Sequence, residues 1–362
     1  MLLRVLRDLS PPAVPENRKG ADRVTAAGSG SVSGRELLLL HLKQGRGAWV
    51  SGQFLSERMA MTRTAVWKQV GALKADGYVI ESSTRKGYRL VDVPDLLRIE
   101  EVRDGLRTRV LGRKEARHYR DTDSTNSRAR ELAAKGAPEG TLVVAEEQSS
   151  GRGRRERTWF SPPFLGIYAS LVLRPSIPPG EAPRMAILAA VAVADALRSE
   201  TGLPVTIKWP NDILAGGRKI AGILMELATD MGAVDYLVIG VGINVNVPAG
   251  TFPREIRPLA TSVLIETGKE FPRVRLLRRC LESFESCFDL YEAGGFAPLL
   301  LRWKAMSNMI GKPIVVHVPG RDIEGMVADI DENGFLLLRD DGGLDHRIFS
   351  GDVTFLPGTG KG

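Results

Sequence analysis

The stretch Gln148–Trp159 places two glycines and four arginines between Gly151 and Trp159. An apolar run, Thr141–Glu146, precedes it and predicts a strand, and two prolines follow it, so the stretch is predicted to be a loop. Guanidinium groups donate paired hydrogen bonds to phosphates and carboxylates, and glycine lets backbone N–H groups approach an anion. We therefore predict a loop that binds an anionic ligand. A solvated basic loop and a loop that grips nucleic acid are the alternatives.

The composition is that of a globular protein with two or three domains, since the chain has 362 residues of which 43% are hydrophobic. No apolar run is long enough to span a membrane, and the first ten residues do not resemble a signal peptide. Cys280 and Cys287 are expected to be reduced core residues of a cytoplasmic protein. The four histidines form no cluster with metal-ligand spacing, so no protein metal site is predicted.

The N-terminal part is predicted to be a disordered extension, residues 1–32, followed by a winged helix-turn-helix domain, residues 33–95. The extension mixes small and charged residues without periodicity. The domain's expected helices are Glu36–Leu42, Gln53–Met59 and Arg63–Asp76, which ends at Gly77, and its strands are Tyr78–Ser82 and Gly87–Val91.

Charge suggests what the winged helix does. Ser33–Leu90 holds ten Lys/Arg and four Asp/Glu, nearly all of the chain's net charge of +7. Such a concentrated excess indicates nucleic-acid binding, with the third helix in the major groove and the hairpin on the backbone. A three-helix unit for protein contacts is the alternative. The expected DNA contacts lie outside the apolar stripe of the third helix and at the hairpin tip: Arg63, Thr64, Trp67, Lys68, Arg85 and Lys86.

The central segment, residues 96–309, contains several polar clusters. Arg120–Ser127 precedes a helix, where its side chains could either cap that helix or bind a polar ligand. A short strand brings Lys208 to a sharp turn, where it is either an edge residue with a solvated amine or a ligand contact. Gly222 lies inside a predicted strand, as expected where a ligand or another backbone comes close.

The order of elements indicates an α+β fold with a mixed sheet. A half-alternating strand, Gly166–Arg174, and a buried helix, Pro183–Glu200, are expected, and the glycines near Gly240 are too few for a dinucleotide fingerprint. From residue 310 to 362, short strands alternate with glycine turns, which predicts a small β barrel.

These motifs together resemble the biotin protein ligase family, in the bifunctional form that is also the biotin operon repressor. The resemblance runs from about Ser33 to the C-terminus. It implies a class II synthetase-like central ligase domain and an SH3-like C-terminal barrel. The motifs that carry it are Asp123–Asn126, Gln148 with Gly151–Arg155 and Trp159, Lys208–Asp212, Lys219–Leu224 and Gly242–Asn244.

The resemblance implies a two-step reaction with ATP, biotin and Mg²⁺. Biotin and ATP form biotinyl-5′-AMP and pyrophosphate, and biotin then passes to a lysine of biotin carboxyl carrier protein. Lys208 and Arg154 are the expected catalytic residues. The expected biotin contacts are Ser124, Thr125, Asn126, Gln148, Arg152, Gly153, Arg154 and Lys208, and the expected nucleotide contacts are Trp159, Lys219, Gly222 and Asn244.

Physical chemistry agrees with these roles, because a carboxylate that attacks a phosphate brings two anions together and cations offset their repulsion. The resemblance also implies operator DNA as a partner and a homodimer joined edge to edge through its central sheets. The chain departs from the family where Glu156 stands in place of a frequent glycine, and where Pro163–Ile167 lacks a glycine soon after the prolines. Glu156 could pair with Arg155 or Arg157 and so alter the mobility of the loop. Two other functions stay open: a metabolite-sensing transcription factor without ligase activity, and a lipoate ligase.

Overall fold

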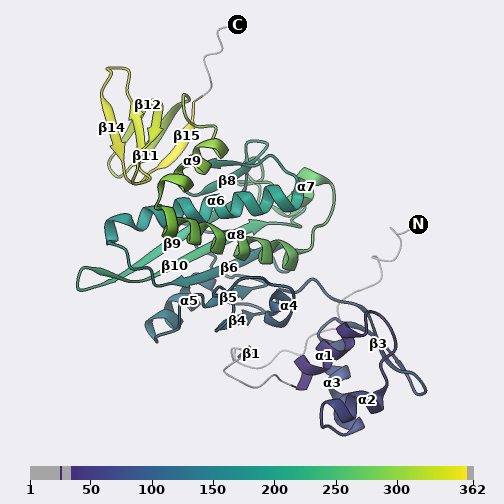
Figure 1. Ribbon diagram of the computed structural model, residues 1–362. Coiled ribbons are helices and arrows are strands. Elements are labelled where there is room, and N and C mark those ends of the chain that lie inside the picture. Colours follow the sequence, from purple (N-terminus) through teal and green to yellow (C-terminus); the bar gives the residue numbers. More distant parts are fainter. Residues whose placement is uncertain (1–24, 27–33, 357–362) are drawn as a thin grey trace.

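The computed structural model describes Thr25, Ala26 and residues 34–356. Within these residues the strands form three sheets. Figure 1 shows the winged helix at one end, the large central sheet in the middle and the small C-terminal sheet at the other end. The α+β class and its three parts agree with the prediction.

The N-terminal unit is a winged helix built on its own core. Ser51 accepts from the backbone N–H of Gln53, and Thr62 accepts from that of Ala65, so each hydroxyl caps the helix that follows it. Gly77 has φ of 96° and follows the end of the third helix. The elements are α1 (Gly34–Gln44), α2 (Gly52–Arg58), α3 (Arg63–Ala75), β2 (Val79–Ser83) and β3 (Gly87–Asp92).

Polar contacts fix this unit against the short helix α4 (Ile99–Arg103). The carboxylate of Glu101 accepts a hydrogen bond of 2.6 Å from the hydroxyl of Tyr78 and another of 2.6 Å from the amine of Lys43. Arg98 forms a 2.7 Å ion pair with Asp76. The winged helix is thus held in a defined orientation to the central part of the chain.

The central sheet has the strand order β1-β4-β5-β6-β10-β9-β8-β7, and it is mixed because β4 and β5 run parallel while their neighbours run antiparallel. The expected disordered extension lies outside the described residues except for β1, which pairs with β4. The strands are β1 (Thr25–Ala26), β4 (Ala116–Tyr119), β5 (Leu142–Ala145), β6 (Gly166–Leu173), β7 (Thr206–Lys208), β8 (Asp212–Ala215), β9 (Arg218–Asp230) and β10 (Ala233–Asn244).

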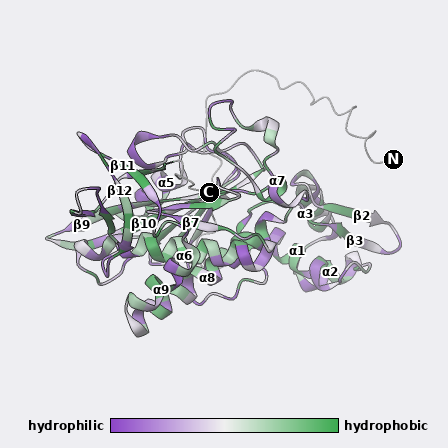
Figure 2. Ribbon diagram, turned by 90° about the horizontal axis from the view of Figure 1, so that it is seen from above, coloured by the Kyte–Doolittle hydropathy of each residue, from purple (hydrophilic) through white to green (hydrophobic). Residues whose placement is uncertain are grey.

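Helices cover both faces of this sheet. On β6, Ile167, Ala169 and Leu171 join the main core with α6 and α8, whereas Val172 packs with α5 on the other face. The whole strand is therefore buried, although its sequence predicted only partial alternation. The apolar colour on α6 and the central strands in Figure 2 follows this layering. The helices are α5 (Thr125–Ala134), α6 (Ala182–Thr201), α7 (Val263–Thr267), α8 (Arg273–Gly294) and α9 (Ala297–Met306), with 3₁₀ turns at Arg154–Glu156, Pro179–Glu181 and Ala249–Thr251.

The C-terminal unit is a five-stranded antiparallel sheet in the order β14-β13-β12-β11-β15. Gly320, Gly334 and Gly343 have φ between 81° and 84°, at the turns that the sequence predicted. The indole N–H of Trp209 donates to the carbonyl of Gly334 at 3.0 Å and ties this sheet to the central part. Its strands are β11 (Pro313–Val318), β12 (Arg321–Ile330), β13 (Leu336–Arg339), β14 (Asp345–Ile348) and β15 (Asp352–Phe355).

Candidate active site

A cavity of about 140 Å³ lies on the α5 face of the central sheet. It lies under the loop Gln148–Trp159, which we call the arginine loop. The loop, the start of α5, strands β8 to β10 and the start of β15 all contribute to it. Eight of the predicted site residues line it on the loop and helix sides: Ser124, Thr125, Asn126, Gln148, Arg152, Gly153, Arg154 and Trp159. Lys219 and Gly222 line the opposite side.

Glycines in β9 and β10 make the floor of this cavity flat. A Cβ atom on Gly240 would overlap the amide of Asn126, and one on Gly242 would overlap the ring of Trp159. A Cβ on Gly222 would lie 2.9 Å from the same ring. The close approach predicted at Gly222 is therefore made by side chains of the site itself.

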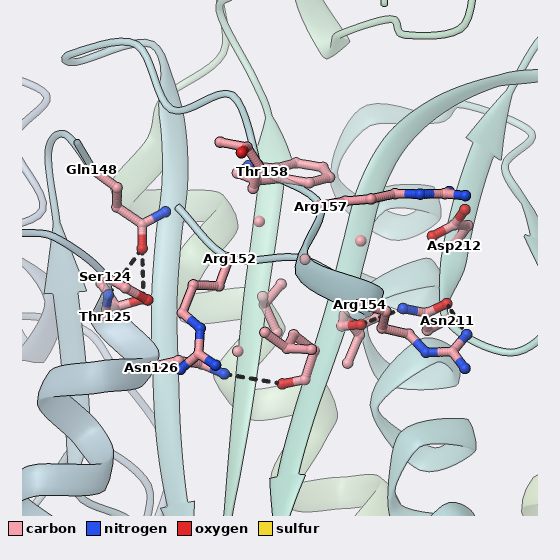
Figure 3. A pocket seen from close by; sticks show the side chains of 18 of the residues that line it. Ser124, Thr125, Asn126, Gln148, Arg152, Arg154, Arg157, Thr158, Asn211 and Asp212 are labelled. Carbon is pink, nitrogen blue, oxygen red and sulfur yellow. Dashed lines mark hydrogen bonds between the residues drawn. The ribbon is translucent and has the colours of Figure 1, made fainter. Parts of the chain in front are cut away.

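The wall at the start of α5 is a chain of polar contacts (Figure 3). The side-chain oxygen of Gln148 accepts from the backbone N–H of Thr125 at 2.9 Å, and the Gln148 amide donates to Ser161 at 2.8 Å. Ser124 is the N-cap residue, yet its side chain makes no capping hydrogen bond. These contacts favour the ligand-binding interpretation of the cluster over helix capping.

The arginine loop folds back on itself. The N–H of Gly153 donates to the carbonyl of Arg157 at 2.7 Å, and that of Trp159 donates to Gly151 at 2.8 Å. The N–H of Gly153 is therefore already paired and is not free for the anion nest that the sequence suggested. In this structure the guanidinium groups are the loop's means of binding an anion.

Three of these guanidinium groups contact the C-terminal sheet. Arg154 donates to the hydroxyl of Ser350 at 2.7 Å and to the carbonyl of Gly351 at 3.2 Å. Arg155 and Arg157 form ion pairs with Asp352 at 3.5 and 2.7 Å. Burial lowers the pKa of Arg154, and Asp352 partly opposes that effect. Figure 3 shows Arg154 directed toward Asn211, whose side-chain oxygen it reaches at 3.5 Å.

Both departures from the family pattern fall at strained positions. Glu156 has φ of 61° and Phe164 has φ of 62°, in the left-handed region that favours glycine. The expected pairing of Glu156 is wrong, because Arg155 and Arg157 pair with Asp352 instead. A glycine at either position would adopt the same backbone without that strain.

A cation and an aromatic ring meet on the far side of the cavity. The amine of Lys219 forms a 2.6 Å ion pair with Asp212 and lies 5.3 Å from the centre of the Trp159 ring. The indole nitrogen of Trp159 is buried without a hydrogen-bond partner, so it is available to an acceptor on a ligand. This side combines an aromatic surface with a nearby cation.

Two predicted site residues do not line the cavity. Lys208 lies opposite Asp212 on the neighbouring strand, with its amine 5.7 Å from the centre of the Phe355 ring. Burial lowers the pKa of Lys208, and the nearby charge of Asp212 partly opposes this. Asn244 is buried and donates to the carbonyl of Thr261 at 2.9 Å, so its side chain holds the backbone there.

The structure adds residues that the sequence analysis missed. Asn211 and Asp212 belong to a motif that was noted only for its lysine. Glu226 follows Gly222 and Leu224 at the period of two that places strand residues on one face, a signal that could have identified it. No local signal marks Asp352, which reaches the cavity from the C-terminal sheet.

The predicted DNA contacts lie together on the winged helix. Arg63, Thr64, Trp67 and Lys68 are exposed on α3, and Trp67 is 64% exposed. Arg85 and Lys86 are exposed at the tip of the hairpin, where Lys86 also packs near the ring of Trp49. A groove between α3 and the hairpin is lined by Arg63, Trp67 and Arg85.

The described residues offer neither a metal site nor a membrane-spanning helix. They contain no group of three or more His, Cys, Asp or Glu side chains placed to hold a metal ion. None of their helices combines the length and the apolar character that crossing a membrane would require.

Comparisons with known proteins place these features in one family. Residues 35–89 match the HTH domain model, residues 119–244 the Biotin/lipoate A/B protein ligase family and residues 309–356 the Biotin protein ligase C terminal domain. The bifunctional ligase/repressor BirA of Bacillus subtilis is 39% identical over 320 residues, which cover 88% of this chain and 98% of that protein. The chain belongs to the BirA family of bifunctional ligase/repressors.

Other members of the family are more distant. The Escherichia coli bifunctional ligase/repressor BirA is 32% identical over 82% of this chain and 90% of its own length. Among solved structures, the biotin protein ligase of Aquifex aeolicus in complex with biotin and ATP has a TM-score of 0.58 and 27% identity. It covers 68% of this chain and 100% of its own.

Proposed function

We propose that this chain is an ATP-dependent biotin protein ligase that also represses transcription of biotin genes. It forms biotinyl-5′-AMP and pyrophosphate from biotin and ATP, and transfers biotin to a lysine of a biotin carboxyl carrier protein. The observation that carries the proposal is one cavity with a polar wall at Ser124–Asn126, a loop of arginines above it, and Lys219 beside an aromatic ring. Biotin binds toward the polar wall, and the nucleotide binds toward Trp159 and Lys219.

Electrostatics supports the roles of the cations. The biotin carboxylate attacks the α-phosphate, and both groups are anionic at neutral pH, so no general base is needed. Arg154 lines the cavity, and Lys208 is the cross-strand partner of Asp212, which also lines it. Such preorganised cations stabilise the charge that develops in the transition state.

ATP enters as its magnesium complex. Magnesium in nucleotide sites is held by the phosphates and by one or two carboxylates. Two carboxylates line the cavity. Asp352 pairs with two arginines and Asp212 with Lys219 alone, so Asp212 is the residue that would hold the ion. The ion supplies further charge neutralisation at the phosphates.

The arginine loop protects the product. A mixed anhydride such as biotinyl-5′-AMP hydrolyses in water, so a closed loop preserves it until the carrier lysine arrives. Arg152 and Arg154 hold opposite sides of that closed loop, to Glu226 and to Ser350.

A biotin-dependent exchange of labelled pyrophosphate into ATP tests the ligase assignment. We expect exchange with biotin and none with lipoate, which separates this function from that of a lipoate ligase. If neither acid supports exchange, the chain is better described as a metabolite-sensing transcription factor that has no ligase activity.

The repressor function rests on the winged helix and its exposed basic residues. One winged helix reads one half-site, so we propose that two chains bind a palindromic operator as a dimer. The central sheets pair edge to edge, and bound adenylate promotes this pairing by ordering the loops. Sedimentation and operator-shift assays with and without biotin plus ATP test it, and equal operator affinity in both conditions would rule out the switch.

The remaining assignments complete the proposal. We place the domain boundaries after residues 32, 95 and 309, so that each of the last three parts contains one of the described sheets, apart from strand β1 of the central sheet, which lies before residue 32. Use of ATP, together with the free and buried Cys280 and Cys287, supports a cytoplasmic location.

A further inference from the structure

An unbroken chain of hydrogen bonds crosses the polar side of the cavity, and it begins at Glu226. This residue faces the site from β9, with its side chain 18% exposed. Its carboxylate accepts from the amide nitrogen of Asn126 at 2.8 Å. The side-chain oxygen of Asn126 lies 2.6 Å from the hydroxyl of Ser170, which lies 2.8 Å from the hydroxyl of Thr125.

The carboxylate of Glu226 fixes which group donates and which accepts at each step of this chain of hydrogen bonds. An ionised carboxylate only accepts hydrogen bonds, so Asn126 must turn its NH₂ group toward Glu226 and its oxygen toward Ser170. Ser170 has one hydroxyl hydrogen, which the Asn126 oxygen takes. The Thr125 hydroxyl then gives its own hydrogen to Ser170 at 2.8 Å or to the side-chain oxygen of Gln148 at 3.2 Å, and both acceptors lie inside the protein.

The orientation continues past Thr125. Gln148 turns its oxygen toward the backbone N–H of Thr125 and donates from its nitrogen to Ser161. Ser161 donates to the carbonyl of Trp159 at 3.1 Å. The Thr125 hydroxyl therefore donates its hydrogen to a protein acceptor. Toward a ligand it can act only as a hydrogen-bond acceptor.

Burial makes the direction matter. Ser170 is fully buried, and Asn126 and Thr125 are each less than 5% exposed, so water cannot easily replace a mismatched partner. The charge of Glu226 is balanced by Arg152 at 3.1 Å and by Arg130 at 3.3 Å. A carboxylate at this position is therefore compatible with a partly enclosed site.

We propose that Glu226 is a positioning residue for biotin, acting through Asn126 and Ser170 to keep the Thr125 oxygen an acceptor. This rests on the proposed ligase function. The head of biotin is a cyclic urea with two N–H donors, and one of them meets that acceptor. A glutamine at position 226 can donate or accept, so Asn126 can flip and Ser170 can donate to Thr125. In the flipped state one of the two Thr125 lone pairs accepts from Ser170, and the Thr125 hydrogen is left for Gln148 or for the cavity.

Steady-state pyrophosphate exchange with Glu226→Gln tests this. We expect the KM for biotin to rise about tenfold, the size of one lost hydrogen bond in a buried site, while kcat and the KM for ATP change less than about twofold. Glu131→Gln is the matched control, because that glutamate is exposed and pairs with Arg128 on the outside of α5. The control should match the wild type.

Ser170→Ala separates orientation from simple support of the loop. This change breaks the chain of hydrogen bonds without altering the charge of Glu226 or its pairing with Arg152, so it should also raise the KM for biotin. The KM of the double variant should be no higher than that of either single variant. This variant alone decides the question if Glu226→Gln fails to fold. An unchanged KM for biotin in Ser170→Ala, fully multiplied effects in the double variant, or equal losses for biotin and ATP would each overturn the proposal. If the wild type itself shows no biotin-dependent exchange, the ligase function fails, and the inference fails with it.

Discussion

Arg154 and Ser350 are joined by a hydrogen bond of 2.7 Å, although 196 positions separate them in the chain. The first belongs to the arginine loop and the second to the C-terminal sheet. The guanidinium that we assign to the phosphate thus also contacts the C-terminal sheet. The C-terminal sheet therefore acts as the surface on which the loop closes.

Asp352→Asn should loosen that closed loop. The substitution removes the charge that Arg155 and Arg157 share, in partly exposed pairs, and we expect it to cost about 1 kcal/mol of loop closure. Biotinyl-5′-AMP should then leave roughly five times faster, measured as its dissociation rate by stopped-flow tryptophan fluorescence. Asp345→Asn is the control, since Asp345 pairs with Arg339 on the same sheet away from the loop. Equal rates in the two variants would contradict the closing role.

Lys208→Met should separate activity from stability. Losing a cation that stabilises the transition state should lower pyrophosphate exchange by roughly a hundredfold or more. The fold should become slightly more stable near neutral pH, because the lowered pKa of Lys208 shows that the fold disfavours its charged form. That penalty disappears only as pH rises past the pKa of an unfolded lysine. Thermal unfolding and exchange assays test both halves, and unchanged exchange would refute the catalytic role.

The pH profile of the wild-type enzyme follows from the same shift. The useful form of Lys208 is the protonated one, and its pKa lies below the ordinary lysine value because of burial. Exchange activity should therefore decline as pH rises through this lowered pKa, earlier than an exposed lysine would allow. Rates measured across the alkaline range test this, with unfolding followed in parallel to exclude loss of the fold.

Local sequence predicted the helices and strands, and it predicted the site residues at the start of α5 and in the arginine loop. Capping residues, glycine turns and polar clusters act over only a few positions, so they can be recognised in a short stretch. Gln148 and Thr125 meet because the residues that follow β5 lie beside the start of α5. Asp352 could not be predicted in this way, since its place depends on how the C-terminal sheet packs on the loop. The motif predicts a role for Lys208, whereas the contact of its amine with Phe355 depends on how the C-terminal sheet packs on the central one.

Glu156→Gly should stabilise the protein. The left-handed backbone at this position costs a non-glycine residue about 1 kcal/mol, and the added freedom of glycine in the unfolded chain returns part of that gain. We expect a net gain of about 0.5 kcal/mol in the free energy of unfolding, measured by urea denaturation. Lys135→Gly is the control, because Lys135 is exposed with φ of −91° and should lose stability. A loss of similar size in both variants would show that the strain is absent.

Arg63→Ala and Lys86→Ala should weaken DNA binding in different ways. The guanidinium of Arg63 is oriented by Gln53 at 2.7 Å, which suits a side chain that reads a base edge, whereas Lys86 at the hairpin tip suits a phosphate contact. Arg63→Ala should cost about 1–3 kcal/mol on the operator and little on unrelated DNA. Lys86→Ala should weaken both and reduce the salt slope by about one. Titrations at several salt concentrations distinguish the two, and identical profiles would contradict this division.

Glu101→Gln should uncouple the winged helix from the ligase part while leaving catalysis intact. Glu101 accepts hydrogen bonds from Tyr78 and Lys43 of the winged helix, and its side chain is only 5% exposed. The substitution therefore weakens a contact that fixes the orientation of that unit. A dimer then has to order two loosely held winged helices on its operator, which costs conformational entropy. We expect unchanged pyrophosphate exchange and a smaller gain in operator affinity on adding biotin and ATP. Asp104→Asn, which alters only the exposed partner of Lys43, is the control, and an undiminished response in Glu101→Gln would show that this contact does not transmit the signal.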